Sequence, residues 1–200
     1  MTHVLADGLT PVPAGKMATI VTSLQMFEAA PARPMRALTY GLGIARRAYP
    51  TLDWYRDLYR RIGEDLLWFS RLQLADAELQ DILSSPDVEI YTLTCNGQDE
   101  GLLELDFRQP GHCELVFFGV TPGLVGAGAG RLMMNAAIKL AFARPISRFW
   151  VHTCTLDHPN ALDFYRRSGF VPFQRLIEIA DDPRLTGGCK ADAAPQVPML

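Results

Sequence analysis

Residues Glu114–Arg131 read ELVFFGVTPGLVGAGAGR and combine the features of a strand, a turn and the start of a helix. Residues 114–120 are almost all apolar and rich in Val and Phe, which is typical of a strand buried on both faces. Thr121-Pro122-Gly123 is a turn signal that ends this strand. Three glycines at alternate positions, 126, 128 and 130, then precede apolar residues at helical spacing: Leu132, Met133, Ala136, Ala137, Leu140 and Ala141. The stretch therefore predicts a strand, a glycine-rich turn and a helix in succession.

This arrangement indicates an anion site. The N-terminus of a helix has unpaired backbone N–H groups and a partial positive charge, and glycines allow a phosphate to approach them closely. The dinucleotide-binding pattern GxGxxG does not fit, because Arg131 stands where its third glycine belongs. That pattern also requires an acidic residue about 20 positions further on, and none is found there. A pyrophosphate-containing coenzyme of another class is the better interpretation.

The composition indicates one domain over residues 1–200. The chain has 200 residues with 48% apolar content, enough for a single compact core. Residues 1–16 and 181–200 are rich in Gly, Pro, Ala and Asp without periodicity, so we expect tails or surface extensions. A formal net charge of -3 and the lack of a dense basic run argue against a nucleic-acid partner.

The four cysteines are Cys95, Cys113, Cys154 and Cys189, which lie far apart without metal-binding spacing. We expect free thiols, no metal and a cytoplasmic location. No signal-like start and no apolar run of about 20 residues is present, so no membrane association is expected.

The pattern along the chain predicts a mixed α+β fold. Helices are expected at 51–62, closed by a C-cap glycine at Gly63, at 76–84 and at 158–168, in addition to the helix after the glycines. The residues Asn96–Gly101 are interpreted as a hairpin loop, and APARP (30–34) as a connecting loop. The expected strands are 17–27, 36–46, 88–95, 102–108, 114–120, 147–153 and 171–179.

At residues 88–179 the chain resembles the GCN5-related N-acetyltransferase (GNAT) superfamily. The family signature (Gln/Arg)-x-x-Gly-x-(Gly/Ala) is matched at Gly128 and Gly130, whereas Val125 occupies the Gln/Arg position. Arg131 could supply the missing charge. The helix pattern Asn-x-x-Ala-x-x-x-Tyr-x-x-x-Gly-Phe is matched at Ala161, Tyr165 and Gly169-Phe170, with His158 at the Asn position and Asn160 close by.

The resemblance implies a central, mostly antiparallel sheet of six to seven strands with about four flanking helices and two splayed parallel strands at the coenzyme site. It implies acetyl-CoA as cosubstrate and leaves a homodimer open. Backbone groups of the first splayed strand would bind the pantetheine arm. The implied coenzyme-binding residues are Phe118, Gly119, Val120, Val125, Gly126, Ala127, Gly128, Ala129, Gly130, Arg131, His158 and Asn160.

Two residues are candidates for catalysis. An ammonium group must lose a proton before it can attack a thioester, and Glu114 at the start of an apolar strand resembles the general base of histone-type acetyltransferases. Tyr165 could donate a proton to the departing thiolate. Each residue has an alternative interpretation. Glu114 could be a solvated or paired carboxylate, with His152 as the base instead, and Tyr165 could be a packed aromatic.

The group VHTCTLDHP (151–159) also permits a metal or Cys-His hypothesis, although a strand followed by an N-cap at Asp157 explains these residues better. For the acceptor we expect aromatic residues of the early helices, Trp54, Tyr55, Tyr59 and Trp68, with Phe69 nearby and Arg56, Arg60 and Arg71 available for a carboxylate.

The sequence thus predicts an N-acetyltransferase acting by direct attack of a primary amine, on a small molecule or a protein. A non-catalytic CoA-binding module and a transferase for longer acyl-CoA donors are the alternatives.

Overall fold

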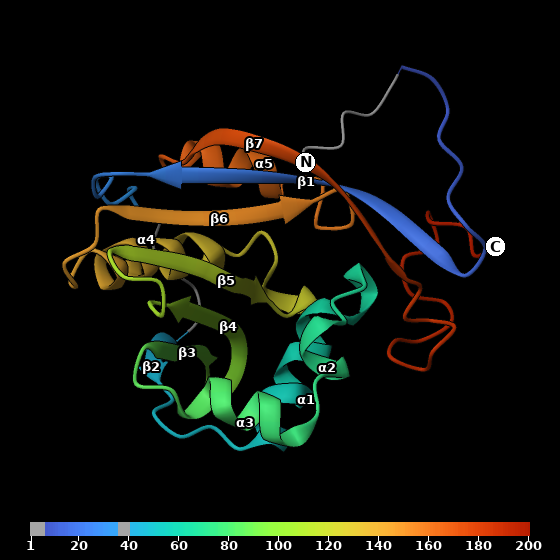
Figure 1. The fold of residues 1–200 in the computed structure, drawn as a ribbon. Coiled ribbons are helices and arrows are strands. Elements are labelled where there is room, and N and C mark those ends of the chain that lie inside the picture. The colour runs from blue at the N-terminus through green and yellow to red at the C-terminus, as the bar shows by residue number, and fades with distance from the viewer. Residues whose placement is uncertain (1–6, 36–40) are drawn as a thin grey trace.

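A computed structural model describes residues 7–35 and 41–200, which form one seven-stranded sheet (Figure 1). The strand order is β2-β3-β4-β5-β6-β1-β7. In the described chain β5 and β6 pair in parallel, whereas the other neighbouring strands pair antiparallel. The strands are β1 Lys16–Met26, β2 Leu42–Arg46, β3 Val88–Cys95, β4 Gln98–Asp106, β5 His112–Val120, β6 Arg148–Cys154 and β7 Val171–Asp181. This architecture confirms the mixed, mostly antiparallel α+β fold.

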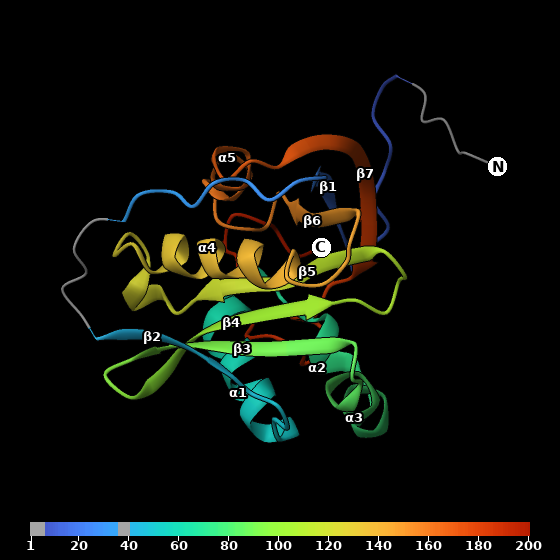
Figure 2. The same cartoon turned by 90° about the vertical axis from the view of Figure 1, so that its left-hand side faces the viewer.

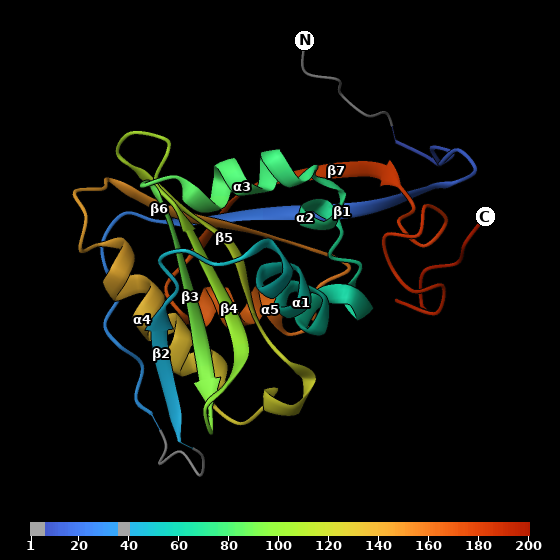
Figure 3. The same ribbon diagram turned by 90° about the horizontal axis from the view of Figure 1, so that it is seen from below.

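The helices cover both faces of the sheet (Figures 2 and 3). Their bounds are α1 Leu52–Gly63, η1 Glu64–Leu66, α2 Ser70–Gln73, α3 Asp76–Ser84, η2 Pro122–Leu124, α4 Ala129–Ala141 and α5 Ala161–Arg167. Helices α1 and α3 pack on β3 and β4, and α4 lies on the opposite face of the same strands. None of the helices in the described ranges is long and apolar enough to cross a membrane.

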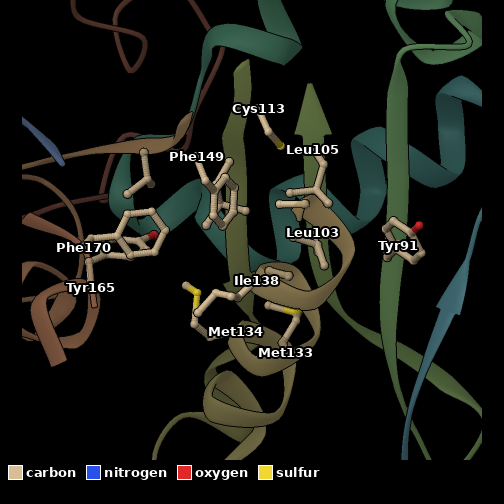
Figure 4. Packing of buried hydrophobic residues seen from close by; sticks show 14 of the residues in the cluster. Tyr91, Leu103, Leu105, Cys113, Met133, Met134, Ile138, Phe149, Tyr165 and Phe170 are labelled. Atoms are coloured by element: carbon tan, nitrogen blue, oxygen red, sulfur yellow. The ribbon is translucent and has the colours of Figure 1, made fainter. Parts of the chain in front are cut away.

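Each of the two main helices forms because one face is apolar. In α1 the Thr51 side chain caps the N-terminus by accepting a hydrogen bond from the Trp54 N–H, and Tyr55, Leu58, Tyr59 and Ile62 are buried. In α4 the buried face consists of Met133, Met134, Ala137, Ile138 and Ala141. Figure 4 shows Met133, Met134 and Ile138 directed at Leu103 and Phe149 of the sheet. Burial of these side chains fixes α4 against β4, β5 and β6.

Three local expectations are corrected. The β3–β4 hairpin turns at Asn96 and Gly97, both with positive φ, so β4 begins at Gln98 and not after a loop to residue 101. The helix expected from residue 158 begins at Ala161. Gly63 is not a left-handed C-cap: its φ is -117°, and a Cβ there would lie 2.3 Å from the Trp68 ring. Close packing of Trp68 therefore requires this glycine.

The first strand lies inside the sheet and not at its edge. β1 pairs with both β6 and β7, so the strand expected at 17–27 is confirmed with partners from the opposite end of the chain. Of the strand expected at 36–46, residues 36–40 lie outside the described ranges, and Leu42–Arg46 form the edge strand β2. The described residues after β1, up to residue 35, pass over α4 (Figure 2).

The C-terminal residues, expected as an extension, contain a buried ion pair. Asp182 and Arg184 are 2% and 8% exposed, and the Arg184 guanidinium also donates to the carbonyls of Ala193, Ala194 and Val197. This C-terminal segment (182–200) packs through Cys189 against Leu67 and Met17. The C-terminal segment is therefore packed against the chain next to η1.

Candidate active site

The site begins where β5 and β6 separate. Their parallel pairing covers only His112–Leu115 with Arg148–Val151, and Figure 1 shows the two strands diverging beyond it. A cavity of about 740 Å³, here called the central cleft, lies in this opening. Its walls are β5 from Val116 onward, β6, the loop around Trp68, and the first turns of α4 and α5. Side chains that are far apart in the sequence thus line one cavity.

One end of the central cleft is the glycine turn (residues 125–130). Gly126 and Gly128 have φ of 82° and 86°, a left-handed conformation that favours glycine. Helix α4 starts directly afterwards at Ala129, so its first N–H groups have no partner within the helix. Val125, Gly126, Gly128, Gly130 and Arg131 line the cleft, whereas Ala129 is buried and Ala127 does not reach the lining. A left-handed glycine turn followed by free helix N–H groups is a geometry that can accept an anion.

The β5 wall is formed by Phe118, Gly119 and Val120, which pair on their other side with β4. A Cβ at Gly119 would lie 2.5 Å from the Ile62 side chain and 3.1 Å from the Trp68 ring. Glycine at this position therefore allows α1 and Trp68 to approach β5 closely, and they close the inner end of the cleft.

Trp68 connects the two separated strands. Its ring lies near Gly119 on β5, and its indole N–H donates to Asp157 Oδ1 at 3.1 Å, after the end of β6. The other carboxylate oxygen of Asp157 accepts from the Thr153 hydroxyl and the Cys154 N–H. Asp157 is therefore not the N-cap of α5, as the sequence suggested; Asn160 precedes that helix without a side-chain cap.

Tyr165 faces the central cleft from α5. Its side chain is 7% exposed and packs near Phe118 and Phe170. Among the side-chain hydrogen bonds of the described residues, none involves its hydroxyl, which leaves that group available to a ligand. Burial, followed by the negative charge of Asp157, raises the pKa of Tyr165, so its phenol stays protonated at neutral pH.

Glu114 and His152 form a pair between two cavities. The His152 Nδ1 lies 3.5 Å from the Glu114 Oε1. His152 lines the central cleft, whereas Glu114 lines a smaller cavity of about 360 Å³ with Asp106, Arg108, Gln109, His112 and Trp150. The interaction with the Glu114 carboxylate raises the pKa of His152, burial opposes this rise, and the charges of Asp157 and Glu178 act in the same direction as Glu114. The imidazole of His152, which lines the central cleft, thus lies next to a carboxylate.

A sequence profile of the Acetyltransferase (GNAT) family matches residues 49–170. The chain belongs to the GNAT acetyltransferase family. It is accordingly an acyltransferase, and acetyl-CoA is the donor that the family uses. Comparison with curated protein sequences gave no significant match.

Solved GNAT structures share the fold. A GCN5-related N-acetyltransferase from Sphaerobacter thermophilus has a TM-score of 0.58 at 17% identity, covering 84% of this chain and 53% of that one. One from Kribbella flavida has a TM-score of 0.56 at 18% identity, covering 86% and 63%. The chain thus spans less than two thirds of both relatives. An aminoglycoside acetyltransferase from an uncultured soil metagenomic sample, solved with sisomicin, has a TM-score of 0.52 at 19% identity, covering 64% and 87%.

The remaining GNAT site candidates fall into two groups. His158, Asn160, Tyr59 and Trp68 line the central cleft, and the His158 Nδ1 accepts from the Asn160 N–H at 3.2 Å. Trp54 and Tyr55 do not line it. The Trp54 indole N–H donates to Asp99 at 2.8 Å, and the fully buried Tyr55 hydroxyl donates to Glu104.

The arginines proposed for an acceptor carboxylate lie elsewhere in this GNAT fold. Arg56 pairs with Asp76, and Arg71 pairs with the buried Glu104, so neither side chain is available to a ligand. Arg60 does not line the central cleft. Within the described ranges, no three His, Cys, Asp or Glu side chains gather as a metal ion would require.

Sequence reasoning missed two contributors to the site. Arg33 lines the central cleft although it belongs to the connection after β1, and a single arginine in APARP gives no local signal of this. The C-terminal segment supports the Trp68 loop through Cys189, whose Sγ lies 4.0 Å from the Trp68 carbonyl oxygen. Only the tertiary fold brings either one to the site.

Proposed function

We propose that this chain is an N-acetyltransferase in which a primary amine attacks acetyl-CoA directly in a ternary complex. The observation that carries the proposal is the continuity of the central cleft, which joins a phosphate-binding turn, an open strand edge, an unpartnered phenol and a histidine–carboxylate pair. Acetyl-CoA, when bound, supplies the acetyl group as a thioester. The protein residues bind it, orient the amine and move protons.

Binding of the donor would use the backbone. The N–H groups of Ala129, Gly130 and Arg131 at the start of α4 would hold the pyrophosphate, since they are free of helical partners. The edge of β5 at Phe118–Val120 that faces away from β4 would bind the pantetheine arm as an additional strand. Backbone donors near Val120 would also polarise the thioester carbonyl.

The proton of the amine would pass to His152. This imidazole lies in the central cleft, whereas Glu114 contacts it from the adjoining cavity. Glu114 would orient the ring and stabilise the imidazolium that forms, so the two residues act as one base. Direct action of Glu114 through water is the alternative assignment of the same step.

Tyr165 would donate its proton to the departing thiolate. Its hydroxyl has no partner among the described side chains, and its raised pKa keeps the proton in place until a base as strong as a thiolate develops. The ring is held by Phe118 and Phe170, so the donor position is fixed.

The packing also favours a short acyl group. Ile62 and Trp68 pack closely on Gly119 and line the central cleft beside it, so the space on this side of β5 is limited. A donor with a long acyl chain would have to displace Trp68 from Asp157.

The deciding experiment is a screen for acetyl-CoA consumption across amine classes, including small amines, amino acids, aminoglycosides and peptides with lysine. We expect turnover with at least one class, reduced by His152→Ala, Glu114→Gln and Tyr165→Phe. Asp163→Asn and Tyr91→Phe are the matched controls, because neither residue lines the central cleft.

Val125 favours one competing function, a non-catalytic CoA-binding module. This residue is 52% exposed where the family places Gln or Arg. Acetyl-CoA binding without turnover on any amine, unaffected by Glu114→Gln and Tyr165→Phe, would establish that function instead.

A further inference from the structure

Three arginines from separate parts of the chain line the central cleft beside the glycine turn. Arg33 belongs to the connection after β1, Arg131 to the first turn of α4, and Arg167 to the last turn of α5. The other cavity-lining residues at this end are glycines and apolar or neutral polar side chains, such as Val125 and Asn160. The cationic character of this end therefore depends on these three side chains.

The position of Arg33 is fixed by α4. Its backbone N–H donates to the Asn135 Oδ1 at 3.0 Å, and its carbonyl accepts from the Asn135 Nδ2 at 2.9 Å. The Arg131 guanidinium donates to the carbonyl of Pro34 at 2.9 Å. An asparagine that satisfies both backbone groups of one residue holds that residue in a single register. The hydrogen bonds of Asn135 and Arg131 thus attach the connection after β1 to α4 next to the glycine turn.

The three guanidinium groups have no carboxylate partner. Among the residues that the structure describes, the ion pairs involve neighbouring arginines such as Arg166, with Asp163, but not Arg33, Arg131 or Arg167. Partial burial, followed by the charges of Arg131 and Arg167, lowers the pKa of Arg33. Like charges gathered without a counterion are unfavourable, and an anionic ligand would relieve this repulsion.

We infer that Arg33, together with Arg131 and Arg167, binds the 3′-phosphate of coenzyme A. The inference rests on the proposed use of acetyl-CoA. The backbone N–H groups of α4 already serve the pyrophosphate, so the arginines are left for a further phosphate. A phosphomonoester carries close to two negative charges at neutral pH and is suited to paired guanidinium donors. Asn135 is the positioning residue that holds Arg33.

Calorimetric titration with coenzyme A and with 3′-dephospho-coenzyme A tests the inference. For the unmodified chain we expect coenzyme A to bind at least about tenfold more tightly, in line with charge-assisted hydrogen bonds. Arg33→Ala should weaken coenzyme A binding about tenfold and leave the dephospho form within about twofold. Asn135→Ala should reduce the same ratio to a smaller extent, which a general loss of packing would not do.

Arg166→Ala is the matched control, because Arg166 neighbours Arg167 but pairs with Asp163 and does not line the cleft. Arg33→Gln is a second variant that retains length, and thermal melting of each variant verifies folding. Equal weakening of both ligands, or no change for either, overturns the role of Arg33 while acetyl-CoA use stands. If the unmodified chain binds neither coenzyme A form, the proposed function itself fails.

Discussion

At the scale of single residues, the pair formed by His152 and Glu114 predicts a particular pH dependence. Neutral His152 is the proposed base, so activity falls as the pH drops below its raised pKa. Glu114→Gln removes the charge that stabilises the imidazolium, which lowers that pKa. The acid limb of kcat/KM should therefore move to lower pH, with a reduced maximum. A pH profile of both proteins measures this, and an unmoved limb would contradict the pairing.

Tyr165 gives a second prediction at this scale. Tyr165→Phe should lower kcat about 100-fold, the lower end for a positioned general acid. The hydroxyl has no protein partner in the described chain, so the melting temperature should change little. Steady-state kinetics at saturating acetyl-CoA, with Tyr91→Phe as control, provide the measurement. A fall in stability with unchanged kcat would mark Tyr165 as a packing residue.

The sequence predicts the role of a residue correctly where that role depends on its neighbours along the chain. It predicts the role wrongly where contacts with distant residues decide it. The strand, the glycine turn and the helix follow from local order and occur in the predicted succession, although β5 already begins at His112 and α4 already begins at Ala129. Asp157 looked like an N-cap because it precedes a helix, yet it accepts from the Trp68 indole N–H. Gly63 looked like a C-cap, yet it makes room for the same ring. Neither contact with Trp68 can be predicted from the residues next to Asp157 or Gly63 in the sequence.

At the scale of elements, the contact between α1 and β5 depends on Gly119. Gly119→Ala would place a Cβ 2.5 Å from the Ile62 side chain, so the helix or Trp68 must shift. We expect a loss of about 1–3 kcal/mol in the free energy of unfolding and a higher KM for acetyl-CoA. Gly123→Ala is the control, because nothing lies within 4 Å of its added Cβ. Urea unfolding compares the two, and equal effects would exclude close packing as the cause.

The strands themselves follow from hydrophobic patterns, but their partners do not. The hairpin loop predicted within Asn96–Gly101 joins β3 and β4, and the structure confirms that these strands pair antiparallel; β5 then pairs antiparallel with β4. The start of β4 was not predicted because it consists of the polar residues Gln98–Glu100, and a polar strand end resembles a loop in sequence. The pairing of β1 with β6 and β7 has no local signal.

At the scale of the whole molecule, the C-terminal segment should contribute to stability through Arg184. Arg184→Ala would leave Asp182 buried without its partner and three carbonyls without a donor, so we expect a loss on the order of 3 kcal/mol. Arg166→Ala, which removes an exposed pair, should change stability by less than about 1 kcal/mol. Chemical denaturation measures both. Similar values for the two variants would show that the segment is held by other contacts.

The position of β1 between β6 and β7 has a consequence for the order of folding. During synthesis β1 leaves the ribosome before the other strands, and its partners β6 and β7 leave it last. The strand therefore stays unpaired while most of the chain is made. Pairings that join the two ends of a chain close large loops and form slowly. The half of the sheet with β2–β5 can assemble from neighbours in sequence, whereas the half that opens the central cleft depends on the final strand. A ribosome-bound chain lacking β7 should therefore expose β1 to chaperones and to proteases.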